Sequence, residues 1–198
     1  MAGERPAKQA TTRKPRVATD ATPPAGTVRL TGLAPLVSPD TRVLVLGSFP
    51  GAASLASGQY YGHPQNHFWK ILAALWPEGA PVMSGPAIDS YERRVSWMLD
   101  HGIGLWDVYA SCERQGSLDS AIRHPVVNDF AALVRQCPKI AAVVHNGAES
   151  FRHAAAGAVP GLPVYRLPST SPANASWSFG RKLAAWREVF DKHGWTDG

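Results

Sequence analysis

The segment from Tyr60 to Trp69 holds the most unusual group of side chains in the sequence. It reads Tyr-Tyr-Gly-His-Pro-Gln-Asn-His-Phe-Trp, which places four aromatic residues, two histidines and one asparagine within ten positions. Aromatic faces stack on nucleobases, and the amide of Asn66 can pair with a base edge or hold a water molecule. Because an amide is not a base at neutral pH, Asn66 can position water but cannot deprotonate it. The segment therefore predicts a site that binds a base beside an oriented water.

Two other interpretations of this segment remain open. Asn66 stands directly before a periodic apolar stretch, so it can serve as a helix N-cap, and a cap does not exclude a catalytic role. His63 and His67 are four residues apart, as two zinc ligands on a helix would be. Pro64 lies between them and no Glu accompanies them in a His-Glu-x-x-His pattern, so we expect neither a metal site nor a cofactor.

A tight turn, Gly47-Ser-Phe-Pro-Gly51, follows a short apolar run. Glycine and proline fix a sharp backbone path there, and N–H groups of the turn can face a ligand. The turn lacks the Gly-Lys-Ser/Thr ending of a phosphate-binding loop. It also lacks the Gly-x-Ser-x-Gly pattern of a nucleophile elbow, so we expect no acyl transfer through Ser48. Taken alone, the motif is equally compatible with an ordinary strand-to-loop turn.

Two later segments also combine polar side chains with sharp turns. Asn146, in His145-Asn-Gly147, either lines a pocket or caps the helix that follows. The segment from Pro168 to Asn174 reads Pro-Ser-Thr-Ser-Pro-Ala-Asn. Its hydroxyl and backbone N–H groups suit phosphate contacts, and its prolines limit the entropy lost on binding. A capped surface loop is the alternative for this segment.

Four short apolar runs and five amphipathic stretches must position these residues. We predict strands over residues 42–47, 102–108, 139–144 and 162–167, and helices over residues 67–76, 90–101, 129–136, 148–156 and 180–193. Apolar strands that alternate with helices are typical of a parallel sheet between two helix layers. In such folds the site lies beyond the carboxyl ends of the strands. The turn after the first strand, Asp107, Asn146 and the 168–174 loop all fall there, so we expect one composite pocket.

Composition and charge limit the classes of protein to which this chain can belong. The chain has 198 residues, two cysteines and a net charge of +5. Residues 1–27 hold five basic and two acidic residues, and we predict that they form a disordered basic tail. The tail either speeds encounter with DNA or is an inert extension. We expect one domain over residues 28–198, without a membrane span or secretion signal, in a cytoplasmic monomer whose two thiols are reduced.

Five motifs occur in one order, and together they resemble a known family. They are Gly47–Gly51, Tyr60–Trp69, Gly104-Leu-Trp-Asp-Val108 with Gly116-Ser-Leu-Asp119, His145–Gly147 and Leu167-Pro-Ser-Thr-Ser-Pro172. The set resembles the hypoxanthine-DNA glycosylases, or DNA-deoxyinosine glycosylases, the sixth family of the uracil-DNA glycosylase superfamily. The resemblance implies an α/β fold over residues 28–198, a three-layer α/β/α sandwich with a four-stranded parallel sheet. It also implies hydrolysis of the N-glycosidic bond of deaminated bases in DNA, hypoxanthine above all, in base excision repair.

The resemblance assigns roles to individual residues. Asn66 is implied as the catalytic residue, whereas Ser48-Phe49 stands where other superfamily members often carry an Asp or Asn that positions water. The base pocket is expected to contain Gly47, Ser48, Phe49, Pro50, Gly51, Tyr61, His63 and Asn146. Contacts to DNA are expected from Pro168, Ser169, Thr170, Ser171, Pro172 and Asn174. No lysine nucleophile stands out, so we expect a monofunctional enzyme without a lyase step.

Three alternatives stay open at this point. A glycosylase of the same superfamily can act mainly on uracil or on a thymine mismatch, and the shape of the pocket decides between such substrates. A non-catalytic module would bind damaged DNA and yield no abasic product. A small-molecule hydrolase is disfavoured, because the sequence shows neither a nucleophile elbow nor a Ser–His–Asp arrangement.

Overall fold

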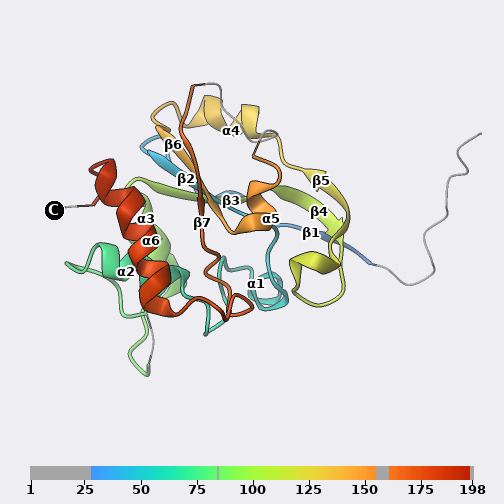
Figure 1. The fold of residues 1–198 in the computed structure, drawn as a ribbon, viewed down its shortest axis with the longest axis horizontal. Helices are drawn as coiled ribbons and strands as arrows, with labels where there is room; N and C mark the ends of the chain where they lie inside the picture. The colour runs from blue at the N-terminus through green and yellow to red at the C-terminus, as the bar shows by residue number, and fades with distance from the viewer. Residues whose placement is uncertain (1–27, 84, 155–160, 197–198) are drawn as a thin grey trace, which may run out of the picture.

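The computed structural model describes residues 28–83, 85–154 and 161–196, so the predicted basic tail over residues 1–27 lies outside the described residues. Its centre is a four-stranded parallel sheet, ordered β3-β2-β6-β7 (Figure 1). The strands are β2 (Val43–Gly47), β3 (Ile103–Asp107), β6 (Ala142–Asn146) and β7 (Val164–Leu167). The predicted fold class, with its four parallel strands between helices, is confirmed.

The central strand β2 explains why its sequence is apolar throughout. All five of its residues are buried, and successive side chains point to opposite faces of the sheet. Val43 and Val45 belong to one core cluster, whereas Leu44 and Leu46 belong to another. Each side chain of this kind contributes about 1.5–3 kcal/mol when it is fully buried. The sheet is therefore held from both faces, which fixes the strand ends that carry the polar residues.

Three helices cover the face of Val43 and Val45. They are α2 (Phe68–Leu75), α3 (Tyr91–Asp100) and α6 (Phe179–Lys192), grouped on the left in Figure 1. Apolar side chains at helical spacing pack into this cluster, among them Trp186 and Phe190 of α6. Ser90 and Ser178 cap α3 and α6 by accepting hydrogen bonds from backbone N–H groups three residues later. Among the described residues, no helix is long and apolar enough to cross a membrane.

The opposite face of the sheet is covered by α1 (Ala52–Ser57), α4 (Phe130–Gln136) and α5 (Ala148–Phe151). The predicted helix over residues 148–156 is shorter in the structure. It ends at Phe151, turns follow at residues 152–154, and residues 155 and 156 lie outside the described residues. The two cysteines, Cys112 and Cys137, are buried in the core cluster of this face and are not joined by a disulfide.

A second, antiparallel sheet lies on the same side and was not predicted. Its order is β1-β4-β5, from β1 (Arg29–Thr31), β4 (Tyr109–Glu113) and β5 (Arg123–Val127). Strand β4 begins two residues after β3 ends, so one stretch of chain leaves the main sheet and enters the small one. A short helix, η1 (Asp119–Ala121), lies in the connection from β4 to β5. This connection brings polar residues to the edge of the main sheet.

Candidate active site

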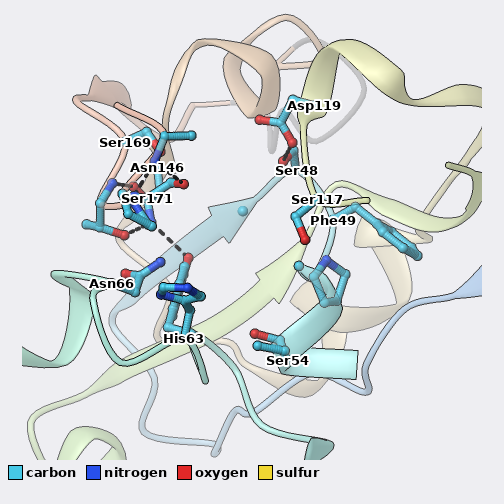
Figure 2. Close-up of a pocket in the computed structure, with 18 of the residues that line it drawn as sticks. Ser48, Phe49, Ser54, His63, Asn66, Ser117, Asp119, Asn146, Ser169 and Ser171 are labelled. Carbon is cyan, nitrogen blue, oxygen red and sulfur yellow. Dashed lines mark hydrogen bonds between the residues drawn. The ribbon is translucent and has the colours of Figure 1, made fainter. Parts of the chain in front are cut away.

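A cavity of about 460 Å³ opens at the carboxyl ends of the parallel strands. The turn after β2, the 60–66 loop, the end of β3, the segment before η1, the end of β6 and the loop after β7 all line it. Figure 2 shows Asn66, His63 and Asn146 on one side and Ser48 with Asp119 on the other. The volume falls within the usual range for small-ligand sites. Segments far apart in the sequence therefore meet at one cavity.

Asn66 lies in the wall of this cavity and is half-buried. Its Oδ1 atom accepts a hydrogen bond of 2.9 Å from the N–H of Phe68, at the start of α2. His67 occupies the N-cap position, so Asn66 caps the helix from one residue further out. Its Nδ2 group makes no hydrogen bond to the described residues, and the second lone pair of Oδ1 is available for a ligand. The side chain of Asn66 thus caps α2 and also presents its amide to the cavity.

The two tyrosines before Asn66 make different contacts. Tyr60 is buried, donates its hydroxyl to the carbonyl of Leu33 at 3.2 Å and anchors the loop. Tyr61 adopts a left-handed backbone conformation with φ of 54°, and its ring stacks on Phe68 with 4.1 Å between centroids. That backbone conformation is uncommon outside glycine, so the surrounding contacts must hold it. His63 is exposed at the rim of the cavity.

Both the Nδ2 group and the Oδ1 atom of Asn146 are hydrogen-bonded within the protein. Its Nδ2 group donates to the hydroxyl of Tyr61 at 3.0 Å and to the hydroxyl of Thr170 at 2.9 Å. Its Oδ1 atom accepts from the N–H of Thr170 at 2.9 Å. The cap position of α5 is taken by Gly147, without a side-chain cap, so Asn146 does not cap that helix. Asn146 therefore positions two loops beside the cavity.

Helix α6 holds the loop after β7 in place. Lys182 is 1% exposed and donates to the carbonyl of Ser171 at 3.0 Å, and burial lowers the pKa of this lysine. Thr170, an expected DNA contact, lines the cavity, and its side chain is completely buried against Asn146. Pro168 lines a neighbouring hollow and not this cavity. The other expected contacts line the cavity, and they are Ser169, Ser171, Pro172 and Asn174.

The turn after β2 is packed against charged residues. Arg114 is buried, donates to the carbonyl of Pro50 and lies over the ring of Phe49, with 5.0 Å between its Cζ atom and the ring centroid. Phe49 is 6% exposed and belongs to the core, so little of its ring can stack on a base. The N–H of Ala52, just after the turn, donates to the hydroxyl of Ser117 at 2.9 Å. That N–H is therefore already paired.

Two acidic residues also line the cavity: Asp107, which the sequence placed at the composite pocket without a role, and Asp119, which was not predicted there. Asp107 ends β3, is 4% exposed, and its Oδ2 atom has no hydrogen-bond partner among the described residues. Burial, followed by the negative charge of Asp119, raises the pKa of Asp107 to about 7, although Arg114 opposes the shift. Asp119 accepts a hydrogen bond of 2.6 Å from the Ser48 hydroxyl. The signal available in the sequence was an acidic residue at the end of a buried strand.

No group of three or more His, Cys, Asp or Glu residues suited to a metal ion occurs within the described part of the chain. His63 and His67, which have the spacing of zinc ligands, lie in different settings. His63 is exposed, whereas the ring of His67 packs edge-on against Phe179 with 5.4 Å between centroids.

Comparison with known proteins identifies the family. The family model described as the uracil DNA glycosylase superfamily matches residues 34–191. A protein of Methanosarcina barkeri named hypoxanthine DNA glycosylase is 32% identical over 161 residues, which cover 81% of this chain and 98% of that protein. A protein of the same name from Methanosarcina acetivorans is 33% identical over 159 residues, covering 80% and 96% of the two chains.

A solved structure supports the same assignment. The solution structure of a candidate uracil DNA glycosylase from Methanosarcina acetivorans superposes with a TM-score of 0.69 and 30% identity. The match covers 82% of this chain and 99% of that one. Sequence and fold agree over the region that forms the cavity, and the chain belongs to the uracil DNA glycosylase superfamily.

Proposed function

We propose that this protein is a monofunctional DNA glycosylase that hydrolyses the N-glycosidic bond of hypoxanthine in DNA. The observation that carries the proposal is the position of Asn66, whose amide lies in the cavity at the strand ends with hydrogen-bonding capacity to spare. Two relatives that match nearly their whole length to this chain are named hypoxanthine DNA glycosylase. Hypoxanthine is the deaminated form of adenine, so the reaction belongs to base excision repair.

The reaction begins with extrusion of the damaged nucleotide into the cavity. Extrusion costs a few kcal/mol, and least at a mispaired lesion. Cleavage of the C–N bond then builds positive charge on the sugar and negative charge on the departing base. The amide of Asn66 holds and orients the water that attacks the sugar carbon. Because an amide cannot take up the proton at neutral pH, the rate comes from fixed geometry and not from general-base strength.

The remaining residues support binding and the absence of a lyase step. Among the described residues that line the cavity there is no lysine, which fits release of a base by water alone. Ser171, Pro172 and Asn174 stand at the rim, where they can contact the phosphates beside the lesion. One chain supplies every residue invoked, so a monomer suffices for this function.

A panel of duplexes tests the proposal. Each duplex carries hypoxanthine, uracil, xanthine or a thymine mismatch at one position, and the product is scored as an abasic site cleaved by alkali. The hypoxanthine duplex is expected to react fastest. Faster excision of uracil or thymine would replace the proposed substrate, and tight binding without any abasic product would indicate a non-catalytic module.

The variant Asn66→Ala separates catalysis from capping. It is expected to lower the excision rate by more than about 100-fold, since one positioned polar group is commonly worth that much. It also removes a cap, which costs about 1 kcal/mol of stability. Ser90→Ala is the matched control, because Ser90 caps α3 by accepting the N–H of Arg93. The control should lose similar stability and keep full activity. Undiminished excision by Asn66→Ala would overturn the assignment.

A further inference from the structure

We propose that the carboxyl group of Asp107 is a base-binding contact, which pairs with the flipped base through one donated and one accepted hydrogen bond. The inference rests on the proposed glycosylase activity and adds which group of the protein the base meets at the end of β3. Asp107 lines the cavity at this position, next to the turn that follows β2.

The position of the carboxyl group is fixed by the backbone. Asp107 pairs in register with Gly47 on the neighbouring strand, and its carboxyl packs directly over the Gly47 α-carbon. A Cβ atom built on Gly47 would overlap Oδ1 of Asp107. The hydroxyl of Tyr61 would lie 3.5 Å from that same Cβ, so the carboxyl and the phenol share one corner of the cavity. The carboxyl group of Asp107 therefore has a defined position at the wall of the cavity.

The hydrogen bonding of Asp107 is incomplete inside the protein. Its Oδ2 atom is buried and has no partner among the described residues. Buried polar atoms in folded proteins nearly always have a partner, and those that lack one call for an explanation. Among the neighbouring polar groups, Asn146 bonds to Tyr61 and Thr170, and Nη2 of Arg114 bonds to Pro50, whereas Nε and Nη1 of Arg114 have no partner among the described residues. A ligand in the cavity supplies the missing partner.

Burial, and secondly the negative charge of Asp119, favours a protonated Asp107 carboxyl near neutral pH. Asp119, in the segment after β4, adds a negative charge, while Arg114 adds a positive one. Burial is the largest influence and raises the pKa of Asp107 to about 7. Tyr60 and Tyr61, in the loop after α1, face the same group, and burial raises the pKa of both phenols, so they remain neutral. At pH 7 about half of the protein therefore carries the proton on Asp107.

A protonated carboxyl matches the edge of a deaminated base. It presents one O–H donor beside one C=O acceptor, whereas a carboxylate only accepts. Deamination of adenine leaves a ring N–H next to a carbonyl oxygen, so the neutral acid can donate to the oxygen and accept from the N–H. The ionised form loses the donor and repels the oxygen. Base binding through Asp107 therefore requires the proton.

Two substitutions test this requirement. Asp107→Asn keeps the size of the side chain and supplies a donor and an acceptor at every pH, whereas Asp107→Ala supplies neither. The readout is single-turnover excision of hypoxanthine from about pH 6 to about pH 9. The wild-type rate is expected to fall above about pH 7, approaching tenfold per pH unit. Asp107→Asn is expected to stay within about tenfold of the wild-type rate near pH 6 and to lose the alkaline fall. Asp107→Ala should be slower by about 100-fold throughout.

Asp129→Asn is the matched control, because Asp129 caps α4 away from the cavity. It should keep the wild-type rate and profile. The inference would be overturned if Asp107→Ala excised hypoxanthine as fast as wild type, or if Asp107→Asn kept the fall in rate at alkaline pH. Either result would leave the glycosylase assignment intact. A wild-type protein that releases no base would instead overturn the proposed function. Should Asp107→Ala fail to fold, the profile of Asp107→Asn decides alone.

Discussion

Asn146 and Thr170 exchange two hydrogen bonds of 2.9 Å, one from the Thr170 N–H to Oδ1 and one from Nδ2 to the Thr170 hydroxyl. Nδ2 also reaches the hydroxyl of Tyr61 at 3.0 Å. The end of β6, the loop after β7 and the loop that carries Asn66 are therefore joined through one amide. The geometry of the cavity depends on this junction, because it ties the end of β6 to two loops that lack regular secondary structure.

Asn146→Ala is expected to destabilise the protein by about 2–3 kcal/mol, since it leaves two buried polar groups of Thr170 without partners. The excision rate should fall at least about tenfold as the loops shift. Urea denaturation and single-turnover excision measure the two effects. Thr170→Val is the companion variant, because it keeps the backbone bond and removes only the hydroxyl, at a cost of about 1 kcal/mol. Equal losses from both variants would contradict the junction.

Burial of His145 is expected to lower the free energy of unfolding in mild acid. Its Nδ1 atom lies 2.7 Å from the Ser150 hydroxyl, which itself donates to the carbonyl of Leu46, so Nδ1 carries the proton. Burial lowers the pKa of His145 from 6.5 to about 4. The unfolded chain therefore takes up a proton as the pH falls through about 6.5, while the folded protein does not until about pH 4. Taken alone, His145 should lower the stability by about 3 kcal/mol across that window, while Asp107 acts in the opposite direction.

The measurement is urea denaturation of wild type and of His145→Gln at pH values on both sides of the window. The variant is expected to start less stable at neutral pH, because it loses the bond to Ser150, and then to lose less on acidification. Two curves that fall in parallel would show that His145 does not titrate as described.

Asp107 should contribute the opposite trend over nearly the same pH range. Its pKa is raised from 3.8 to about 7, so the folded protein keeps a proton that the unfolded chain has released. Stability is therefore lost as the pH rises from about 4 to about 7, by up to about 4 kcal/mol. Asp107→Asn removes this loss and should melt at a higher temperature than wild type above pH 7. A lower melting temperature for the variant at alkaline pH would contradict the assignment of a neutral, buried carboxyl.

Lys182→Met tests whether the hydrogen bond from Lys182 holds the loop after β7 in place. The substitution keeps an unbranched side chain of similar length, and replacing a buried charge by an apolar group is often neutral for stability. Affinity for duplex DNA should fall about fivefold, because the carbonyl of Ser171 loses the donor that holds the loop. Lys192→Met, at the exposed end of α6, removes the same charge far from the loop and controls for net charge. Equal effects of the two variants would show that only charge matters.

Much of the main sheet could be predicted from the sequence, because β2, β3 and β6 are buried almost throughout. The predicted strand over residues 42–47 corresponds to β2, and the prediction over residues 102–108 corresponds to β3. Strand β5 shows why the second sheet was missed. All of its residues are exposed and it contains Pro125, so it has neither an apolar run nor an alternating pattern. It is held by pairing with β4, which is a tertiary contact that local sequence does not show.

The site was predictable where a motif carries an unusual composition. Asn66 stood out because aromatic residues and glycine surround it, and the structure places it at the cavity. Thr170 could not be separated from its neighbours in a run of hydroxyl residues, because only the fold shows that it points inward to Asn146. Asp119 was not identified because its hydrogen bond to Ser48 joins residues 71 positions apart.

Because Asp107 contacts Gly47, the substitutions that these two positions tolerate depend on each other. Any side chain at position 47 needs the space that the carboxyl fills, so an alanine there is tolerable only when position 107 has become small. Across a set of homologous sequences, exchanges at the two positions should therefore occur in pairs. An engineer who alters the turn after β2 must redesign the end of β3 in the same step.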